Sequence, residues 1–173
     1  RGRRRWLGFL VASAVITVAA PLFFSSPLPE NWPAYLLLCL LFLFTCCSLG
    51  LLIGVVSGSS RSTILWSQMI YLPSMILSGM MVPADLLPET FVRIGHLLPA
   101  SYVMQSFLGL AYGRETLYPP AAGALVLLAG GIIASGLAVY LFNWDRRNNT
   151  RRGHPALAAL ALLPYLLGAL LLV

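Results

Sequence analysis

Apolar residues fill long stretches of this chain, and charged residues are confined to short groups between them. Four stretches contain no Asp, Glu, Lys or Arg, namely residues 6–24, 34–56, 63–82 and 119–142. An apolar helix of about 20 residues crosses the ~30 Å hydrocarbon core of a bilayer, and each stretch is about that long or longer. The pattern therefore predicts an all-α, polytopic membrane protein in which these stretches are transmembrane helices.

The end of the chain contains a fifth apolar stretch. Residues 148–173 begin as a polar, Arg-containing linker and continue as an Ala- and Leu-rich run that Pro164 interrupts. Proline removes a helix hydrogen bond and kinks or ends a helix, so the run is either an extra span or a broken one. The expected fold class has four to five transmembrane helices, with residues 1–147 as the main unit and 148–173 as a cytoplasmic linker and candidate extra span.

Residues 83–118 differ from the spans because prolines and charges recur within them. Pro83, Pro88 and Pro99 punctuate this region, and residues 100–112 are apolar but too short to cross a bilayer. Three tyrosines at headgroup level are expected here because Tyr is enriched at membrane interfaces: Tyr102, Tyr112 and Tyr118. We expect an outer, re-entrant or interfacial region built from short helices.

The charges fix an orientation for these spans. All eleven basic residues are Arg, and only Arg93 and Arg114 fall on the side opposite to the others in the alternating topology. Cytoplasmic loops of membrane proteins carry the excess of Lys and Arg, so residue 1 is expected on the cytoplasmic side. Basic residues at the ends of spans, rather than on one amphipathic face, argue against nucleic acid as a partner of this chain and for the lipid bilayer.

Small residues recur on one face of the second predicted span. Gly50, Gly54 and Gly58 follow each other at intervals of four, which is the spacing of a helix–helix packing stripe in lipid. The three cysteines, Cys39, Cys46 and Cys47, lie in the same span without metal-ligand spacing. We interpret the glycines as packing residues and the thiols as small apolar side chains.

Hydroxyl groups line one face of the third predicted span. Ser67, Tyr71, Ser74 and Ser78 are separated by four, three and four positions, which places them on the same side of a helix. Such groups serve either as hydrogen-bonding contacts between helices or as the lining of a substrate path. Both interpretations stay open, and Pro73 within this span predicts a kink.

The sequence lacks the common signatures of catalysis. It contains no lysine and hence no phosphate-binding loop of the G-x-x-x-x-G-K-[ST] type, and no G-x-S-x-G or H-E-x-x-H motif. His96 is expected to be a solvated helix residue rather than a catalytic base. We therefore expect no enzymatic activity, no catalytic residue, and no metal or cofactor bound by this chain.

The block from Leu72 to Pro99 carries a resemblance to a known family. It reads Leu-Ser-Gly at 77–79, Met-Met-Val-Pro at 80–83, Leu-Pro at 87–88, and Leu-Pro at 98–99 followed by Tyr102. In this order the residues resemble the carboxy-terminal part of the permease subunits of type-2 ATP-binding-cassette (ABC) exporters. The segment Tyr-Leu-Phe-Asn-Trp-Asp at 140–145 is similar to the family's last membrane segment.

The resemblance implies a specific architecture and partners. Residues 1–147 would supply spans three to six of a six-span permease half, with the first two spans and the coupling helix absent from this sequence. The half would pair with a second permease half, as a homo- or heterodimer, in a plasma membrane. A cytoplasmic ABC ATPase would bind ATP and Mg²⁺, and the permease would export substrate by alternating access. The family motif residues would be Ser78, Gly79, Pro83, Pro88, Pro99 and Tyr102.

The resemblance also assigns a candidate gate. In the family the apolar pair after Ser-Gly narrows the outer end of the path, and here that pair is Met80 and Met81. An apolar constriction excludes water by dewetting, and flexible Met side chains adapt to varied substrates. Two other interpretations stay open, a non-transporting membrane scaffold or assembly subunit and an intramembrane hydrolase.

Overall fold

The computed structural model describes residues 28–82, 86–142 and 155–172, and every regular element among them is helical. The order is α2 (Trp32–Val56), α3 (Ser60–Leu77), α4 (Glu89–Gly95), α5 (Pro99–Ser106), the π-helix η2 (Phe107–Ala111), α6 (Pro120–Leu141), the 3₁₀-helix η3 (Pro155–Leu162) and α7 (Leu163–Leu172). The prediction of an all-α fold is confirmed. The predicted span 6–24 lies outside the described residues.

Two of the described helices are long and apolar enough to cross a membrane. Helix α2 has 25 residues and α6 has 22, so at about 1.5 Å per residue both exceed the ~30 Å bilayer core. They correspond to the predicted spans 34–56 and 119–142. Helix α3 starts at Ser60 and ends at Leu77 after 18 residues, earlier than the predicted end at 82.

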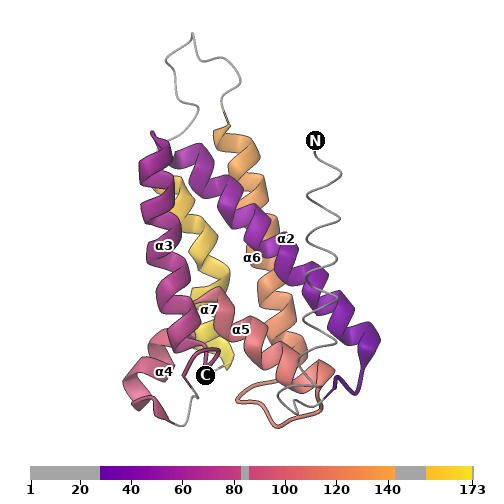
Figure 1. Ribbon diagram of the computed structural model, residues 1–173. Coiled ribbons are helices and arrows are strands. Elements are labelled where there is room, and N and C mark those ends of the chain that lie inside the picture. The colour runs from indigo at the N-terminus through magenta and orange to yellow at the C-terminus, as the bar shows by residue number, and fades with distance from the viewer. Residues whose placement is uncertain (1–27, 83–85, 143–154, 173) are drawn as a thin grey trace. The chain divides into compact units, whose positions relative to one another are not determined.

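Polar residues define where α2 and α3 begin. The Asn31 side chain accepts a hydrogen bond from the Ala34 N–H at 3.2 Å, which caps the first turn of α2. Ser59 and Ser62 form a reciprocal capping box at the start of α3. Each cap satisfies backbone donors that a helix end leaves free. The short linker between the two helices thus forms a tight connection at one end of the bundle (Figure 1).

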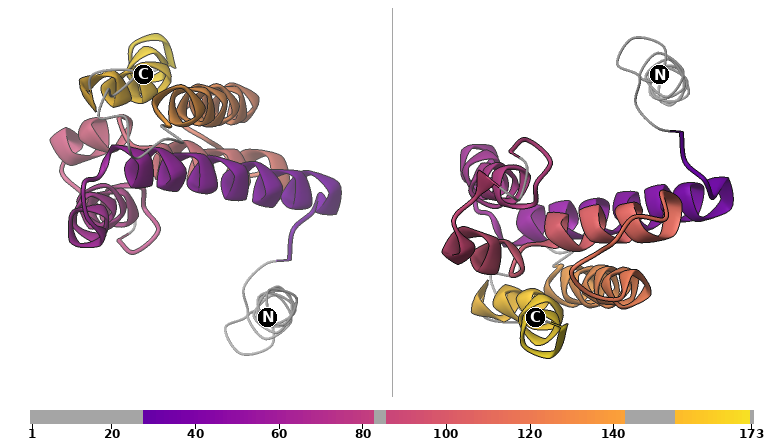
Figure 2. Two further views of the ribbon diagram at one scale, coloured as in Figure 1. Left: turned by 90° about the horizontal axis from the view of Figure 1, so that it is seen from above. Right: turned by 90° about the horizontal axis from the view of Figure 1, so that it is seen from below.

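The core forms around α6. This helix packs against α2, α5, α7 and η3, and the views along the bundle show α6 between α2 and the carboxy-terminal segment (Figure 2). The Thr45 hydroxyl of α2 donates to the Leu127 carbonyl of α6 at 3.2 Å, and Gly131 lets the Phe44 ring lie directly on the α6 backbone. Small residues and buried hydroxyls of this kind allow helices to associate closely in lipid.

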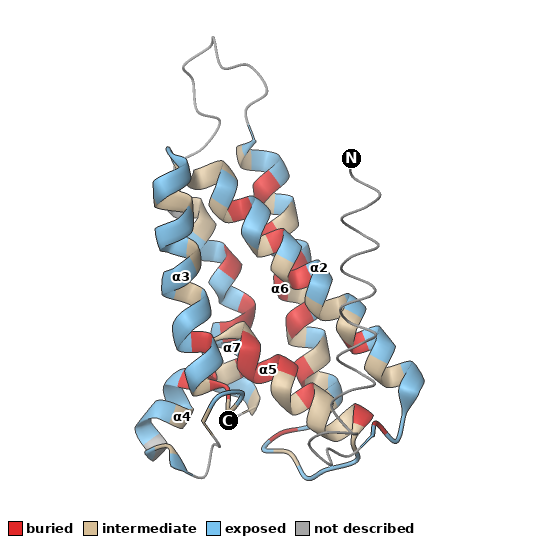
Figure 3. Cartoon of the chain, in the orientation of Figure 1, coloured by how far each residue is buried: buried red, intermediate tan, exposed pale blue. Residues whose placement is uncertain are grey.

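Helix α3 is packed very differently from α6. Ser74 is the only residue of α3 that is buried, and pale blue exposed positions cover the helix in Figure 3. Its large exposed side chains are Ile64, Leu65, Trp66, Met69, Tyr71, Leu72, Met75 and Ile76. Helix α3 therefore presents an apolar surface that the described part of this chain leaves uncovered.

Candidate functional site

Helix α3 ends in a sharp turn at the Ser-Gly pair of the sequence motif. The Ser78 N–H donates to the Ser74 carbonyl at 3.1 Å, and Gly79 follows with φ at 83°. That backbone conformation costs a residue with a side chain much more than it costs glycine. The turn is closed further on by a hydrogen bond from the Met81 N–H to the Met75 carbonyl at 3.3 Å. The motif glycine is thus explained by the geometry that ends the helix.

The two methionines of the candidate gate lie immediately after this turn. Met80 is 41% exposed and Met81 is 66% exposed, so neither side chain is packed into the core of the described chain. Pro83, the next motif residue, lies outside the described residues. The turn at Gly79 therefore places two flexible apolar side chains at one end of the bundle, next to the uncovered surface of α3.

The two later prolines of the motif each begin a short helix. Pro88 precedes α4, and Pro99 occupies the first turn of α5, where its fixed φ suits a helix start and its missing N–H is not needed. Short helices after the third predicted span were expected, and the structure contains them. Residues 99–111 form one helical segment, α5 continued by η2, close to the predicted 100–112.

Helix α4 folds back onto the end of α3. Gly95 lies directly on the Leu77 backbone, and a Cβ at position 95 would come within 2.6 Å of the Leu77 carbonyl oxygen. The Ser101 hydroxyl then donates to the Gly95 carbonyl at 2.6 Å, which ties α5 to the end of α4. We call residues 95–102 the elbow. Its backbone contacts anchor the end of α3 and hence the start of the methionine turn.

Tyr102 anchors the elbow in the core. Its side chain is fully buried, and its hydroxyl donates to the Tyr165 carbonyl of α7 at 3.0 Å. The rings of Tyr118 and Tyr165 lie on either side, with centroids 5.6 Å and 5.9 Å away. Tyr102 and Tyr118 are thus buried in protein, and their position at headgroup level stays a prediction. Tyr112 is only partly buried, and its ring contacts Tyr35.

His96 extends this aromatic cluster. Its side chain is 5% exposed, and its ring lies edge-on to Tyr118 with centroids 5.8 Å apart. Nδ1 has no hydrogen-bond partner among the described residues. Burial disfavours the charged imidazolium and lowers the pKa of His96. The expectation of a solvated His96 is therefore wrong, and the residue is a neutral part of the elbow.

The predicted hydroxyl stripe on α3 divides into two halves. Ser74 and Ser78 are buried, and their hydroxyls donate to backbone carbonyls of α3 itself, those of Ile70 and Met75. Ser67 is partly buried, whereas Tyr71 is exposed. The half nearer the turn is thus engaged with its own helix, as serine in a helix often is.

The predicted glycine stripe has no neighbour within the described chain. A Cβ built at Gly50, Gly54 or Gly58 meets no described atom within 4 Å, and Gly58 lies beyond the end of α2. Close helix contacts occur instead at Gly123, Gly130 and Gly131 of α6 and at Gly168 of α7. Sequence spacing did not single these out, although α6 contains the adjacent pair Gly130 and Gly131.

The described residues hold no group of three or more His, Cys, Asp or Glu side chains that could bind a metal ion. The features that the structure brings together concern packing and exposure at the end of α3. They are the turn at Gly79, the exposed methionines, the elbow that anchors them and the uncovered surface of α3.

Comparison with known proteins decides the family. The sequence model of the family described as ABC-2 family transporter protein matches residues 5–141, which is most of the chain. The chain belongs to the ABC-2 transporter family. It is thus a membrane component of an ABC transporter, a permease rather than the ATPase, and the resemblance seen in the Leu72–Pro99 block is confirmed. The ABC-2 assignment covers α2 to α6 and leaves out η3 and α7.

One curated relative agrees with this assignment. ABC transporter G family member 20 of Dictyostelium discoideum is 32% identical over 146 residues, which is 80% of this chain but 19% of the relative. The chain therefore spans about a fifth of that relative's length. No solved structure matches the chain significantly.

Proposed function

We propose that this ABC-2 chain is the carboxy-terminal part of a permease half that exports substrate by alternating access. A separate cytoplasmic ABC ATPase would bind ATP and Mg²⁺ and supply the free energy. ATP is needed because a cargo alone shifts the inward and outward states only by its differential affinity for them. The observation that carries the proposal is the methionine turn at the end of α3, which joins the family motif to an exposed apolar surface.

We assign the uncovered face of α3 to the contact with a second permease half and to the path between the halves. Of the 18 residues of α3 only Ser74 is buried, and large contiguous apolar surfaces usually mark a protein or lipid contact. Gly50 and Gly54 on α2 also face open space, which suits close approach of another helix. In this arrangement Met80 and Met81 would narrow the outer end of the path.

The elbow gives this gate a fixed base. Gly95 on Leu77, the Ser101 hydrogen bond and the buried Tyr102 connect the end of α3 to α6 and α7. A rocking motion of the permease half would therefore carry the end of α3 together with the elbow, while the two methionine side chains remain free to change rotamer. Hinge motions of domains commonly move packed elements as rigid bodies in this way.

Copurification tests the proposal directly. The full parent protein, extracted in mild detergent, is expected to bring down a stoichiometric partner with a phosphate-binding loop and vanadate-sensitive ATP hydrolysis. Addition of substrate candidates should stimulate that hydrolysis. A stable oligomer without any ATPase would contradict the proposal and favour the scaffold interpretation.

A further inference from the structure

A cavity of about 370 Å³ lies between α2, α3 and η3, at the end of the bundle opposite the elbow. Its size falls within the range of small-molecule sites. The lining residues are Leu49, Leu52, Ile53, Val56, Ser57, Trp66, Ile70, Ala158, Ala159, Ala161 and Leu162. Nine of them are aliphatic, so the cavity suits an apolar occupant.

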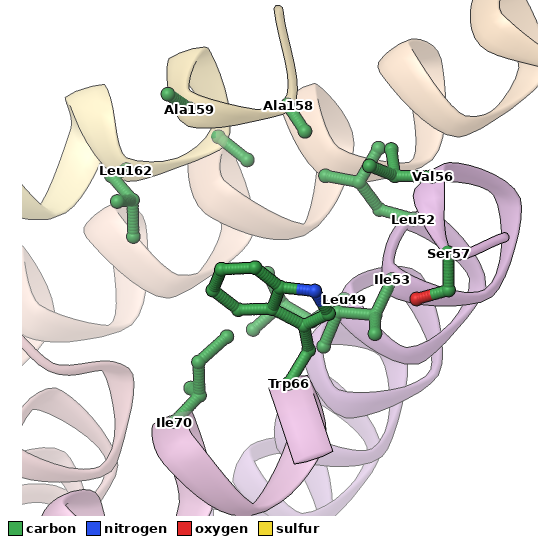
Figure 4. A pocket seen from close by; sticks show the side chains of 11 residues that line it. Leu49, Leu52, Ile53, Val56, Ser57, Trp66, Ile70, Ala158, Ala159 and Leu162 are labelled. Atoms are coloured by element: carbon green, nitrogen blue, oxygen red, sulfur yellow. The ribbon is translucent and has the colours of Figure 1, made fainter. Parts of the chain in front are cut away.

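Two side chains at this cavity carry polar atoms: the Ser57 hydroxyl, which can donate or accept a hydrogen bond, and the Trp66 indole N–H, which donates. Figure 4 shows the indole of Trp66 across the cavity and the Ser57 hydroxyl directed toward it from the end of α2. The Ser57 oxygen is buried and has no hydrogen-bond partner among the described residues. A buried hydroxyl without a partner destabilises the protein, because it has lost its hydrogen bonds to water. A ligand with an acceptor oxygen at this end would remove that destabilisation.

The basic residue nearest to Ser57 in the sequence is Arg61, which does not line the cavity. Arg61 is in the first turn of α3, four positions after Ser57, and is exposed. The Ser57 hydroxyl and the indole N–H of Trp66 offer donors at the lining, and Arg61 offers a cation four positions from Ser57. The complementary group is an anionic oxygen, as in a carboxylate or a phosphate ester, at the end of an apolar chain.

We propose that this cavity binds one acyl chain of an anionic amphiphile, with the acidic head toward Ser57 and Arg61. We call it the acyl site. Because η3 supplies one wall, the site depends on residues beyond the 5–141 match to the ABC-2 family. It goes beyond the proposed export function, since lipid binding here needs neither ATP nor a partner ATPase.

The test uses the parent protein in phosphatidylcholine vesicles with a fatty acid that carries a photoreactive diazirine on its chain. We expect saturable labelling of peptides from the end of α2 and from η3, which excess unlabelled oleate abolishes. Photoreactive phosphatidylglycerol in place of the fatty acid distinguishes a phospholipid source from a free acid. A photoreactive phosphatidylcholine should label these peptides less than either anionic probe.

Two matched pairs of variants make the result specific. Ala158→Phe fills the cavity, whereas Leu160→Phe adds a ring at an exposed position of η3 that does not line it. Ala158→Phe should weaken probe binding about tenfold, equivalent to about 1.4 kcal/mol, and Leu160→Phe should leave it unchanged. Likewise Ser57→Ala should weaken binding, and Ser60→Ala, at an exposed serine in the first turn of α3, should not.

Several outcomes would overturn the acyl site. Labelling that does not saturate, or that falls equally on α2, η3 and the exposed face of α6, means annular lipid only. Equal binding of the probe by the Ser57→Ala and Ser60→Ala proteins would also overturn the acyl site, and this comparison holds even if Ala158→Phe fails to fold. Because the assay contains no nucleotide, failure here leaves the ATPase copurification result unaffected.

Discussion

Large side chains are buried in the aromatic core around Tyr102 but exposed on the surface of α3. Tyr102, Tyr118 and Tyr165 are buried against one another, whereas Trp66, Met69 and Leu72 of α3 are more than half exposed. Both regions lie in the same apolar chain, so composition does not distinguish them. The difference indicates that α5, α6 and α7 each bury part of their surface against one another, while α3 buries only Ser74 within the described chain.

We therefore expect substitutions in the two regions to affect different properties, stability in one and transport in the other. Substitutions in the aromatic core should act on folding, because each removes contacts that the chain makes with itself. Substitutions on α3 and its turn should leave folding almost unchanged and act on partner contact or cargo. The following predictions test that division, beginning with the largest effect.

Tyr102→Ala should be the most destabilising. It removes a fully buried ring, two ring contacts and the hydrogen bond to α7, and truncation of a buried aromatic costs about 3–5 kcal/mol. The check is the thermal unfolding midpoint of the protein purified in detergent. Tyr140→Ala, at an exposed tyrosine of α6, is the control and should change the free energy of unfolding by less than about 0.5 kcal/mol. Equal losses of unfolding free energy in the Tyr102→Ala and Tyr140→Ala proteins would contradict the stabilising role of the aromatic core.

Added methyl groups should distinguish the two sets of glycines. A Cβ at Gly131 would lie 2.6 Å from the Phe44 ring, while one at Gly54 meets no described atom. Gly131→Ala should therefore cost about 1–3 kcal/mol through overpacking. Gly54→Ala should slightly raise the stability of the single chain through helix propensity, and should weaken association if α2 contacts a second half. A destabilised Gly54→Ala monomer would place the close contact inside the chain.

The burial of His96 should make stability depend on pH. In the unfolded chain its pKa is about 6.5, and in the folded chain burial lowers the pKa below that value. Above pH 6.5 the residue is neutral in both states. As the pH falls through about 6.5, only the unfolded chain gains the proton, so stability should decrease until the folded pKa is reached.

Thermal midpoints between pH 8 and pH 5 measure this effect. His154→Gln should serve as the background, since it removes the other histidine. In that background, His96→Phe should flatten the profile below pH 6.5. If the midpoint depends on pH just as strongly after His96→Phe, groups other than His96 cause the dependence.

The methionine turn should show the smallest effect on stability and a clear effect on transport. Replacing both Met80 and Met81 by Ala should change the free energy of unfolding by less than about 0.5 kcal/mol, because both side chains are exposed. Export, or substrate-stimulated ATP hydrolysis by the assembled transporter, should change. Leu125→Ala, at an exposed position of α6, is the control and should leave transport unchanged. Normal transport by the double variant would remove Met80 and Met81 from the gate.

Hydrophobic patterning predicted much of this fold. It predicted α2 and α6 nearly to their ends, and it placed a short apolar helix at 100–112, where α5 and η2 run from 99 to 111. Patterning could not predict which helices pack against one another. Tyrosine suits both a lipid interface and a buried site with a hydrogen-bond acceptor, and Tyr102 finds its acceptor 63 positions away on α7.

The candidate site was predictable only in part. The family resemblance marked Ser78, Gly79, Met80 and Met81, but the predicted span ran on to residue 82, past the turn that the backbone makes at Gly79. The burial of His96 follows from the way α4 folds back at Gly95, which no local spacing reveals. The glycine stripe at 50 and 54 stays a prediction about a partner, and the structure gives it no contact within the described chain.

The central claim is that α3 and its outer turn face a second permease half. A photoreactive benzoylphenylalanine in place of Met81 tests it in the assembled protein, with the same residue in place of Leu125, an exposed position of α6, as the control. The account predicts that position 81 crosslinks to the second half, less so after ATP and vanadate trapping, and that position 125 crosslinks only lipid. Capture of the second half from position 125, with only lipid captured from position 81, would contradict it.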